Sequence, residues 1–125
     1  MSEPAVLLVD ADPAIRDSLS TLLGLNGFTV RSFATGSALL RALDHSEVHC
    51  VICEAELPDT TGVDLFRALR DTSHTWPFAL LVSQRNPRTL RHARNAGITH
   101  IFSKPLVHRH LLSFVSDLDI RGSVE

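Results

Sequence analysis

The chain has 125 residues, of which 44% are hydrophobic and 21% are charged, and its formal net charge is −2 at pH 7. This length and composition are typical of one soluble globular domain, and the small negative charge excludes a general attraction to nucleic acid or to anionic lipid. No apolar run approaches the roughly 20 residues that span a membrane, and the N-terminus lacks the pattern of a signal peptide, so we expect a cytoplasmic protein without a membrane partner.

Apolar runs alternate with amphipathic runs in the first half of the chain. The continuous apolar run at 5–9 is typical of a strand buried on both faces, and 13–25 carries leucines at helical spacing. Asp12 precedes the proline that opens this helix, so its carboxylate is predicted to cap the free N–H groups of the first turn. Residues 28–33 are predicted to form a second strand, and Thr35 is predicted to cap a second helix.

The second half of the chain repeats this alternation three times. Strands are predicted at 48–53, 78–82 and 99–103, and helices at 62–72, 87–96 and 107–118. Five strand–helix units predict a single α/β domain with a doubly wound parallel sheet, right-handed crossovers and helices on both faces. We expect this domain to comprise residues 1–118, followed by a polar C-terminal tail at 119–125 that has no helical pattern.

The two cysteines, Cys50 and Cys53, both lie in the third predicted strand. Residues three apart on a strand point to opposite faces, which argues against a disulfide between them. We therefore expect two reduced thiols packed in the core. The seven histidines are scattered along the chain, so their spacing does not predict a metal site.

Polar side chains follow four of the five predicted strands. Asp10 follows the first strand, Glu54 the third, Ser83 the fourth, and Lys104 comes after the fifth. Because the carboxyl ends of parallel strands meet at one edge of the sheet, where ligands bind in such folds, these side chains are expected to converge there. Polar residues after strands are also common in loops that simply meet water, and the residues alone leave this alternative open.

The residues at this edge resemble the receiver domains of bacterial response regulators, the phospho-accepting domains of two-component systems. The resemblance rests on the segments LLVDADPAIRDSL, ELPDTTGVDLFRALR, LLVSQ and AGITHIFSKPL, covers nearly the whole chain and looks closest to receivers of nitrogen-fixation regulators. It implies a flavodoxin-like (βα)5 fold with strand order 2-1-3-4-5. It also implies a signalling function through protein contacts, without enzymatic activity.

The resemblance also implies the roles of individual residues. Asp10 matches the first member of the family's acidic pair, and Ser83 matches its Ser/Thr position. Lys104 matches the family's lysine, whose bond to the following Pro105 is typically cis. Glu54 falls on the phospho-accepting aspartate.

Three positions depart from the family pattern. The acceptor is Glu54 in place of aspartate, the second acid of the pair is replaced by Ala11, and the aromatic switch position holds Ile101. Mg²⁺ requires octahedral oxygen ligands that usually include one or two carboxylates, so we expect weak or no Mg²⁺ binding and no other cofactor. The extra methylene group displaces the carboxylate by roughly 1 to 1.5 Å, and a misplacement of about 1 Å can cost on the order of a hundredfold in rate. Phosphotransfer to Glu54 is therefore expected to be negligible.

Four functional interpretations remain open. A contact between Glu54 and Lys104 would imitate part of the phosphorylated state and set an active-like receiver. The same pair in a fixed scaffold would leave no switch, which Ile101 favours because its side chain cannot form a hydrogen bond. A conventional phosphorylatable receiver would have an acidic residue in place of Ala11 and an aspartate in place of Glu54. A flavodoxin-like binder of flavin or another small ligand would need a phosphate-binding loop after the first strand, where DADPA would repel phosphate.

A basic run is predicted on the outer face of the fourth helix. Arg88 and Arg91 point outward, Arg94 lies at the boundary, and no acid lies between residues 84 and 97. This run is either a solvated helix face or a patch for an acidic protein partner or a second copy of the domain. The resemblance favours association through the fourth helix, fifth strand and fifth helix, with a histidine kinase or an output domain as further partners. Nucleic acid binding by this domain is not expected, because the run has no interleaved aromatic residues.

Overall fold

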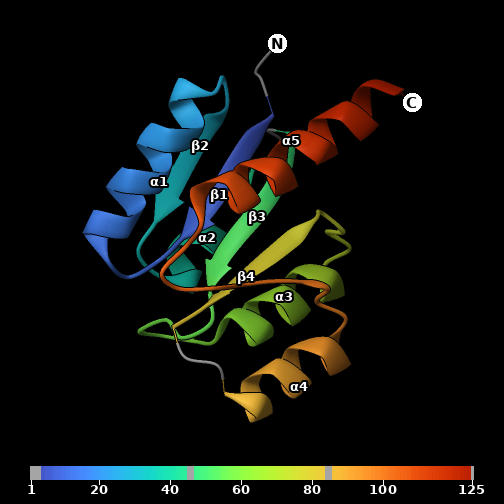
Figure 1. Ribbon diagram of the computed structural model, residues 1–125. Helices are drawn as coiled ribbons and strands as arrows, with labels where there is room; N and C mark the ends of the chain where they lie inside the picture. The colour runs from blue at the N-terminus through green and yellow to red at the C-terminus, as the bar shows by residue number, and fades with distance from the viewer. Residues whose placement is uncertain (1–3, 45–46, 84–85, 125) are drawn as a thin grey trace.

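Strands and helices alternate along the chain as the sequence predicts (Figure 1). The computed structural model describes residues 4–44, 47–83 and 86–124, with side chains described up to residue 118. The strands are β1 (Ala5–Val9), β2 (Thr29–Phe33), β3 (Val48–Glu54), β4 (Phe78–Val82) and β5 (His100–Ser103), and the helices are α1 (Pro13–Leu25), α2 (Gly36–Ala42), α3 (Gly62–Asp71), α4 (Pro87–Ala96) and α5 (His108–Val124). None of these helices, within the residues described, is both long and apolar enough to cross a membrane.

The five strands form one parallel sheet in the order β2-β1-β3-β4-β5, which confirms the predicted fold and strand order. Helices α1 and α5 cover one face of the sheet, and α2, α3 and α4 cover the other (Figure 1). Because all strands run the same way, their carboxyl ends lie along one edge of the molecule. This edge carries the polar residues that follow the strands.

Alternate residues of the central strands enter two separate cores. In β1, Leu7 packs with side chains of α2, α3 and α4, whereas Leu8 packs with side chains of α1 and α5. Cys53 belongs to the first core, Cys50 belongs to the second, and both are free thiols, as predicted. Burial raises the pKa of Cys50 to about 12, so this thiol stays protonated and unreactive at neutral pH.

The predicted N-terminal caps of the first two helices are present. The Asp12 carboxylate accepts a hydrogen bond of 2.9 Å from the backbone N–H of Ala14, at the start of α1. The Thr35 hydroxyl accepts a hydrogen bond of 3.1 Å from the backbone N–H of Ala38, at the start of α2. Both caps satisfy N–H groups that have no partner within the helix, so the sequence correctly marks where these helices begin.

The C-terminal helix is longer than the sequence pattern predicts. Helix α5 begins at His108 and continues to Val124, so the prediction of a tail without helical structure is wrong for residues 119–124. The predicted end was set by the last inward-facing leucine, Leu118. A hydrophobic pattern reports only which side chains are buried, so a helix that continues away from the core leaves no periodic signal. The domain boundary after residue 118 stays a prediction.

Candidate functional site

The ends of four strands bring polar residues to one edge of the sheet. Asp10 follows β1, Glu54 is the last residue of β3, Ser83 follows β4, and Lys104 follows β5. The sheet order places the ends of β1 and β3 side by side, with the ends of β4 and β5 beyond them. The bond between Lys104 and Pro105 is cis, as the resemblance implies.

Lys104 joins the two carboxylates of this edge. Its Nζ donates a hydrogen bond of 2.9 Å to Oδ2 of Asp10 and one of 3.2 Å to Oε1 of Glu54. The side chain of Asp10 is fully buried, and those of Lys104 and Glu54 are 16% and 15% exposed. The three groups therefore form a largely buried ion cluster in which one ammonium group faces two carboxylates.

Asp10 and Glu54 stabilise the protonated form of Lys104. Burial by itself lowers the pKa of Lys104, but the hydrogen bonds and negative charges of Asp10 and Glu54 raise it by more, and the net pKa lies above its ordinary value. The lysine is therefore protonated at neutral pH. It supplies to this edge the positive charge that two neighbouring carboxylates require.

Backbone N–H groups hold the other two carboxylate oxygens. Oε2 of Glu54 accepts a hydrogen bond of 3.2 Å from the N–H of Ala11, and Oδ1 of Asp10 accepts one of 3.0 Å from the N–H of Asp12. Every oxygen of the two carboxylates thus accepts a hydrogen bond from the protein. The loop between β1 and α1 supplies these donors, and the side chain of Ala11 is only a methyl group where the family pattern has an acid.

Arg16 is a further residue of the site, and the sequence analysis missed it. Its Nη1 donates hydrogen bonds of 2.8 Å to the backbone oxygen of Asp10 and 3.1 Å to that of Ala11. A signal for it existed in the sequence. Arg16 is the fourth residue of a helix, near the positive end of the helix dipole, where a cation is unfavourable unless it serves another contact.

Asp59 is a second residue whose role the sequence analysis missed. Its two carboxylate oxygens accept hydrogen bonds of 3.0 Å from the N–H of Gly36 and 2.9 Å from that of Ser37, at the start of α2. The N–H of Ser37, together with that of Gly36, lowers the pKa of Asp59 against the opposing effect of desolvation. The loop after β3 is therefore attached to α2. The Pro-Asp pair in the sequence signals a turn, but it does not identify the helix that the aspartate caps.

Gly62 allows α3 to start directly against the end of β3. A methyl group at this position would lie 2.7 Å from the backbone oxygen of Glu54 and 2.5 Å from Cδ1 of Leu80. Both distances are shorter than normal contacts, and the strand cannot yield without moving the site. We expect Gly62→Ala to lower the free energy of unfolding by about 1 to 3 kcal/mol, measured by urea denaturation.

Gly24 in α1 is the matched control for this substitution. A methyl group on Gly24 would meet no atom within 4 Å. Gly24→Ala is therefore expected to leave stability unchanged or to raise it by up to about 1 kcal/mol, because alanine restricts the unfolded chain and favours the helix. Equal effects of the two substitutions would contradict the close contact at Gly62.

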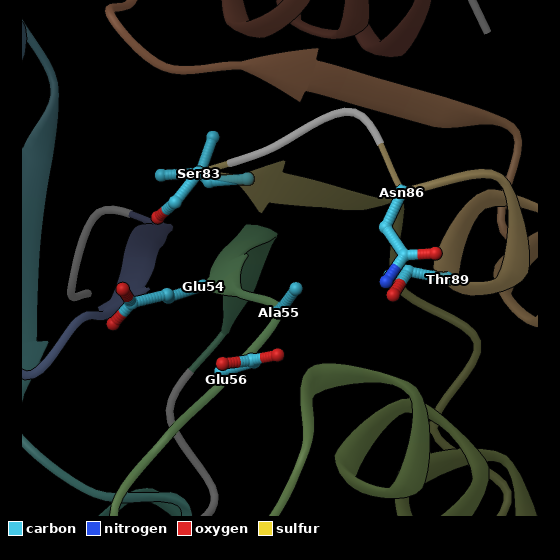
Figure 2. Close-up of a pocket in the computed structure, with 7 residues that line it drawn as sticks. Glu54, Ala55, Glu56, Ser83, Asn86 and Thr89 are labelled. Carbon is cyan, nitrogen blue, oxygen red and sulfur yellow. The ribbon is translucent and has the colours of Figure 1, made fainter.

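A cavity of about 310 Å³ opens beside Glu54. Its lining residues are Glu54, Ala55, Glu56, Leu81, Ser83, Asn86 and Thr89. Figure 2 shows the carboxylate of Glu54 turned away from Asn86 and Thr89 at the opposite wall. Ser83 is exposed, and within the described residues its side chain makes no hydrogen bond to Glu54. Glu54 is therefore hydrogen-bonded to Lys104, and it shares a cavity with Ser83 without a hydrogen bond between the two.

Ile101 and the basic run belong to other parts of the molecule. Ile101 in β5 is partly buried and packs against the core under α3 and α4. The side chains of three arginines on α4 are exposed: Arg88, Arg91 and Arg94. Arg94 is thus fully on the outer face of the helix, whereas the sequence predicts it at the boundary between the buried and exposed faces. Within the described part of the chain, no ion pair joins these arginines to the cluster around Lys104.

Comparisons with known proteins point to one family. The family model of the response regulator receiver domain matches residues 6–116. Response regulator protein TodT of Pseudomonas putida is 26% identical over 110 residues, which cover 88% of this chain and 48% of TodT. Transcriptional regulatory protein FixJ of Bradyrhizobium diazoefficiens is also 26% identical over 110 residues, which cover 88% of this chain and 54% of FixJ. The chain thus spans about half the length of the curated relatives it matches.

A solved structure shows the same fold across the whole chain. The signal receiver domain of an HD domain-containing protein from Pseudomonas fluorescens Pf-5 superposes with a TM-score of 0.88 at 26% sequence identity. The superposition covers 99% of this chain and 100% of that one. The similarity in fold therefore extends over the ten elements of this chain.

Proposed function

Because this chain belongs to the response regulator receiver family, we propose that it is an atypical receiver that signals by protein contact and does not accept a phosphoryl group. Receiver domains of two-component systems are generally non-enzymatic signalling domains, and they interact with histidine kinases and output domains. The main observation in support of this proposal is that the charged residues of the site bind one another. Lys104 pairs with both Asp10 and Glu54.

The residues of the site do not fit Mg²⁺. Every oxygen of Asp10 and Glu54 already accepts a hydrogen bond from the protein, and Ala11 adds no ligand oxygen from its side chain. In the part of the chain that the structure describes, no three His, Cys, Asp or Glu side chains are grouped so that they could hold a metal ion. These features support weak or absent Mg²⁺ binding. The proposed function accordingly involves no cofactor.

The position of the Glu54 carboxylate supports negligible phosphotransfer. An attacking oxygen must be aligned with the phosphoryl donor, whereas Lys104 holds Oε1 of Glu54 and the N–H of Ala11 holds Oε2. Neutralisation of the charge on the transferred group is the main catalytic requirement of phosphoryl transfer. Here the positive charge of Lys104 is already engaged by two carboxylates.

The pair of Glu54 and Lys104 supports an active-like state. It places a negative charge beside the ammonium group that, by the family resemblance, would otherwise pair with a phosphoryl group. The imitation is partial, since a carboxylate has one charge and two oxygens, whereas a phosphoryl group has more charge and three oxygens. In this state the receiver presents its binding surface permanently.

A fixed scaffold is the second candidate, and two observations favour it. Ser83 is exposed and is not hydrogen-bonded to Glu54 within the described residues, and Ile101 has no polar atom with which to change partners. Glu54→Gln separates the two candidates. The substitution would change the affinity for a histidine kinase or output-domain partner in an active-like receiver, and it would leave that affinity unchanged in a scaffold.

Direct phosphorylation of the protein tests the proposal itself. The chain would be incubated with acetyl phosphate and Mg²⁺ and then examined by Phos-tag electrophoresis and intact-mass spectrometry. We expect the unmodified mass only. A stoichiometric phosphorylated species that is lost on Glu54→Gln would overturn the proposal and establish a conventional phosphorylatable receiver.

The exposed arginines of α4 support a contact surface for an acidic partner or a second copy of the domain. Arg88, Arg91 and Arg94 have no acid on their own helix, and a hollow of about 340 Å³ lies beside Pro87, Leu90 and the last two arginines. A cationic face with an apolar floor suits a segment that combines carboxylates with hydrophobic side chains. By the resemblance, this surface includes β5 and α5.

Charge reversal at Arg88 and Arg91 checks this surface. The double substitution R88E/R91E is expected to abolish self-association or partner binding, because the outer face of α4 would then repel acidic groups. Sedimentation velocity over a range of protein concentrations measures self-association, and calorimetry measures binding of a partner. Arg41→Glu on α2 is the control, since Arg41 is also exposed on a helix. Unchanged association in R88E/R91E would rule out the arginine patch.

A further inference from the structure

The peptide group between Asp10 and Ala11 stands between two charged side chains. Its oxygen, the backbone oxygen of Asp10, accepts a hydrogen bond of 2.8 Å from Nη1 of Arg16. Its N–H, the backbone N–H of Ala11, donates a hydrogen bond of 3.2 Å to Oε2 of Glu54. A guanidinium group and a carboxylate thus bind the two ends of the same peptide unit.

This arrangement polarises the peptide group in one direction. A cation at the oxygen draws electrons away from the nitrogen, which makes the N–H a stronger donor, and hydrogen bonds in such chains strengthen one another by roughly 10 to 30% per bond. Bonds that end on an ionised group are also stronger than neutral ones. The contact at Ala11, at 3.2 Å, therefore connects the charge of Arg16 to that of Glu54 through one peptide group.

We propose that Arg16 is a positioning residue for Glu54 and acts on its carboxylate through this single peptide group. Lys104 holds Oε1 of Glu54 directly, and Arg16 holds Oε2 indirectly, so the acid lies between two cations. This inference rests on the proposed function, in which Glu54 is kept in one position. It adds the residue that keeps it there.

The other contacts of Arg16 agree with this role. Its Nη1 also donates to the backbone oxygen of Ala11 at 3.1 Å, so the guanidinium group fixes two successive peptide groups of the β1–α1 loop. Within the described residues Arg16 forms no ion pair with a carboxylate. Its positive charge is therefore directed at the loop that faces Glu54 and not at an acid on its own helix.

NMR of the Ala11 amide tests the inference in the whole chain. In Arg16→Met we expect the Ala11 amide proton to shift upfield and its exchange with solvent to become about tenfold faster, which corresponds to the loss of one net hydrogen bond. Arg16→Lys retains a positive charge, so it should restore most of the chemical shift. Arg41→Met on α2 is the control and should leave the Ala11 signal in place.

Repeating the measurement in a Glu54→Gln protein distinguishes an effect of Arg16 on the Glu54 carboxylate from a general effect on the stability of the β1–α1 loop. If Arg16 acts on the carboxylate, the effect of Arg16→Met on the Ala11 amide will shrink in a Glu54→Gln protein, because the charge at the far end of the peptide group is gone. An Ala11 signal that does not respond to Arg16→Met would overturn the inference. So would a response of equal size in both backgrounds, since this would show a structural role that is independent of Glu54.

The result does not depend on the phosphorylation experiment. A phosphorylated Glu54 would overturn the proposed function and leave the coupling between Arg16 and Glu54 in the unmodified chain unaltered. Conversely, an uncoupled Ala11 amide would remove Arg16 from the site, while the ion pairs of Lys104 and the absence of labelling would stand.

Discussion

Replacing Lys104 with methionine is expected to lower the free energy of unfolding by about 3 to 5 kcal/mol at pH 7. Lys104 is the only lysine of the chain, and its ammonium group is the partner of both Asp10 and Glu54. Without it, the fully buried carboxyl group of Asp10 would lie beside a second carboxylate with no cation to compensate. Urea denaturation followed by circular dichroism measures this loss.

The double variant Asp10→Asn/Lys104→Met is the matched control for the buried charge. Removing the fully buried acid together with its cation leaves only Glu54, which is 15% exposed, without an ammonium partner, so most of the lost stability is expected to return. Arg41→Met, at an exposed cation, should change stability by less than about 0.5 kcal/mol. A loss below about 1 kcal/mol for Lys104→Met would show that water or another group satisfies Asp10, and the closed ion cluster would then be wrong.

The pH dependence of stability tests the same interaction of Lys104 with the two carboxylates. Since the pKa of Lys104 is raised in the folded protein above its ordinary value of 10.5, its contribution is fully present below pH 10.5 and is lost as the pH rises through the higher folded value. The wild-type protein should therefore lose stability in this alkaline range relative to Lys104→Met. Denaturation curves of the two proteins between pH 8 and pH 12 test this difference, and parallel curves would contradict it.

The double substitution Ala11→Asp/Glu54→Asp is expected to confer phosphorylation, which in the proposed function the natural chain does not undergo. It moves the acceptor carboxylate back toward the strand by roughly 1 to 1.5 Å, and it adds the second acid of the pair. Because a displacement of about 1 Å can cost on the order of a hundredfold in rate, the gain should be at least of that order. Labelling with acetyl phosphate in the presence of Mg²⁺, followed over time on Phos-tag gels, measures it.

The variant Ala11→Asp/Glu54→Asn controls for labelling elsewhere in the chain. It carries the same new acid at position 11 but has no carboxylate at position 54, so it should not be labelled. Glu54→Asp alone should fall between the natural chain and the double variant, since one of the two departures remains. If the double variant is labelled no faster than the natural chain, the departures at these positions do not limit phosphorylation.

A closed ion cluster changes how such a receiver can take part in signalling. In the proposed function, the state of the site would be set by synthesis of the protein and not by a kinase. Regulation would then act through the amount of protein or through competition at its contact surface. The exposed arginines of α4 form the contact surface that we propose.

The sequence by itself determined the element order, the two helix caps and the edge at which the site lies. Apolar periodicity and caps such as Asp12 and Thr35 act within a few residues, so they can be read without the fold. Strand-end acids and the lysine meet because parallel strands align their carboxyl ends. This single geometric rule predicted that Asp10, Glu54 and Lys104 would converge.

Only the tertiary structure decided which atoms meet at this edge. Asp59 caps a helix that begins 23 residues earlier in the chain, and Arg16 reaches Glu54 through a peptide group of a different loop. Such contacts depend on the path of the backbone in space, and a local signal such as the position of Arg16 in the first turn of α1 does not identify the partner. The free energy of a hydrogen bond falls steeply over fractions of an ångström and with angle, so the partners of each oxygen become defined only when all five strands are in place.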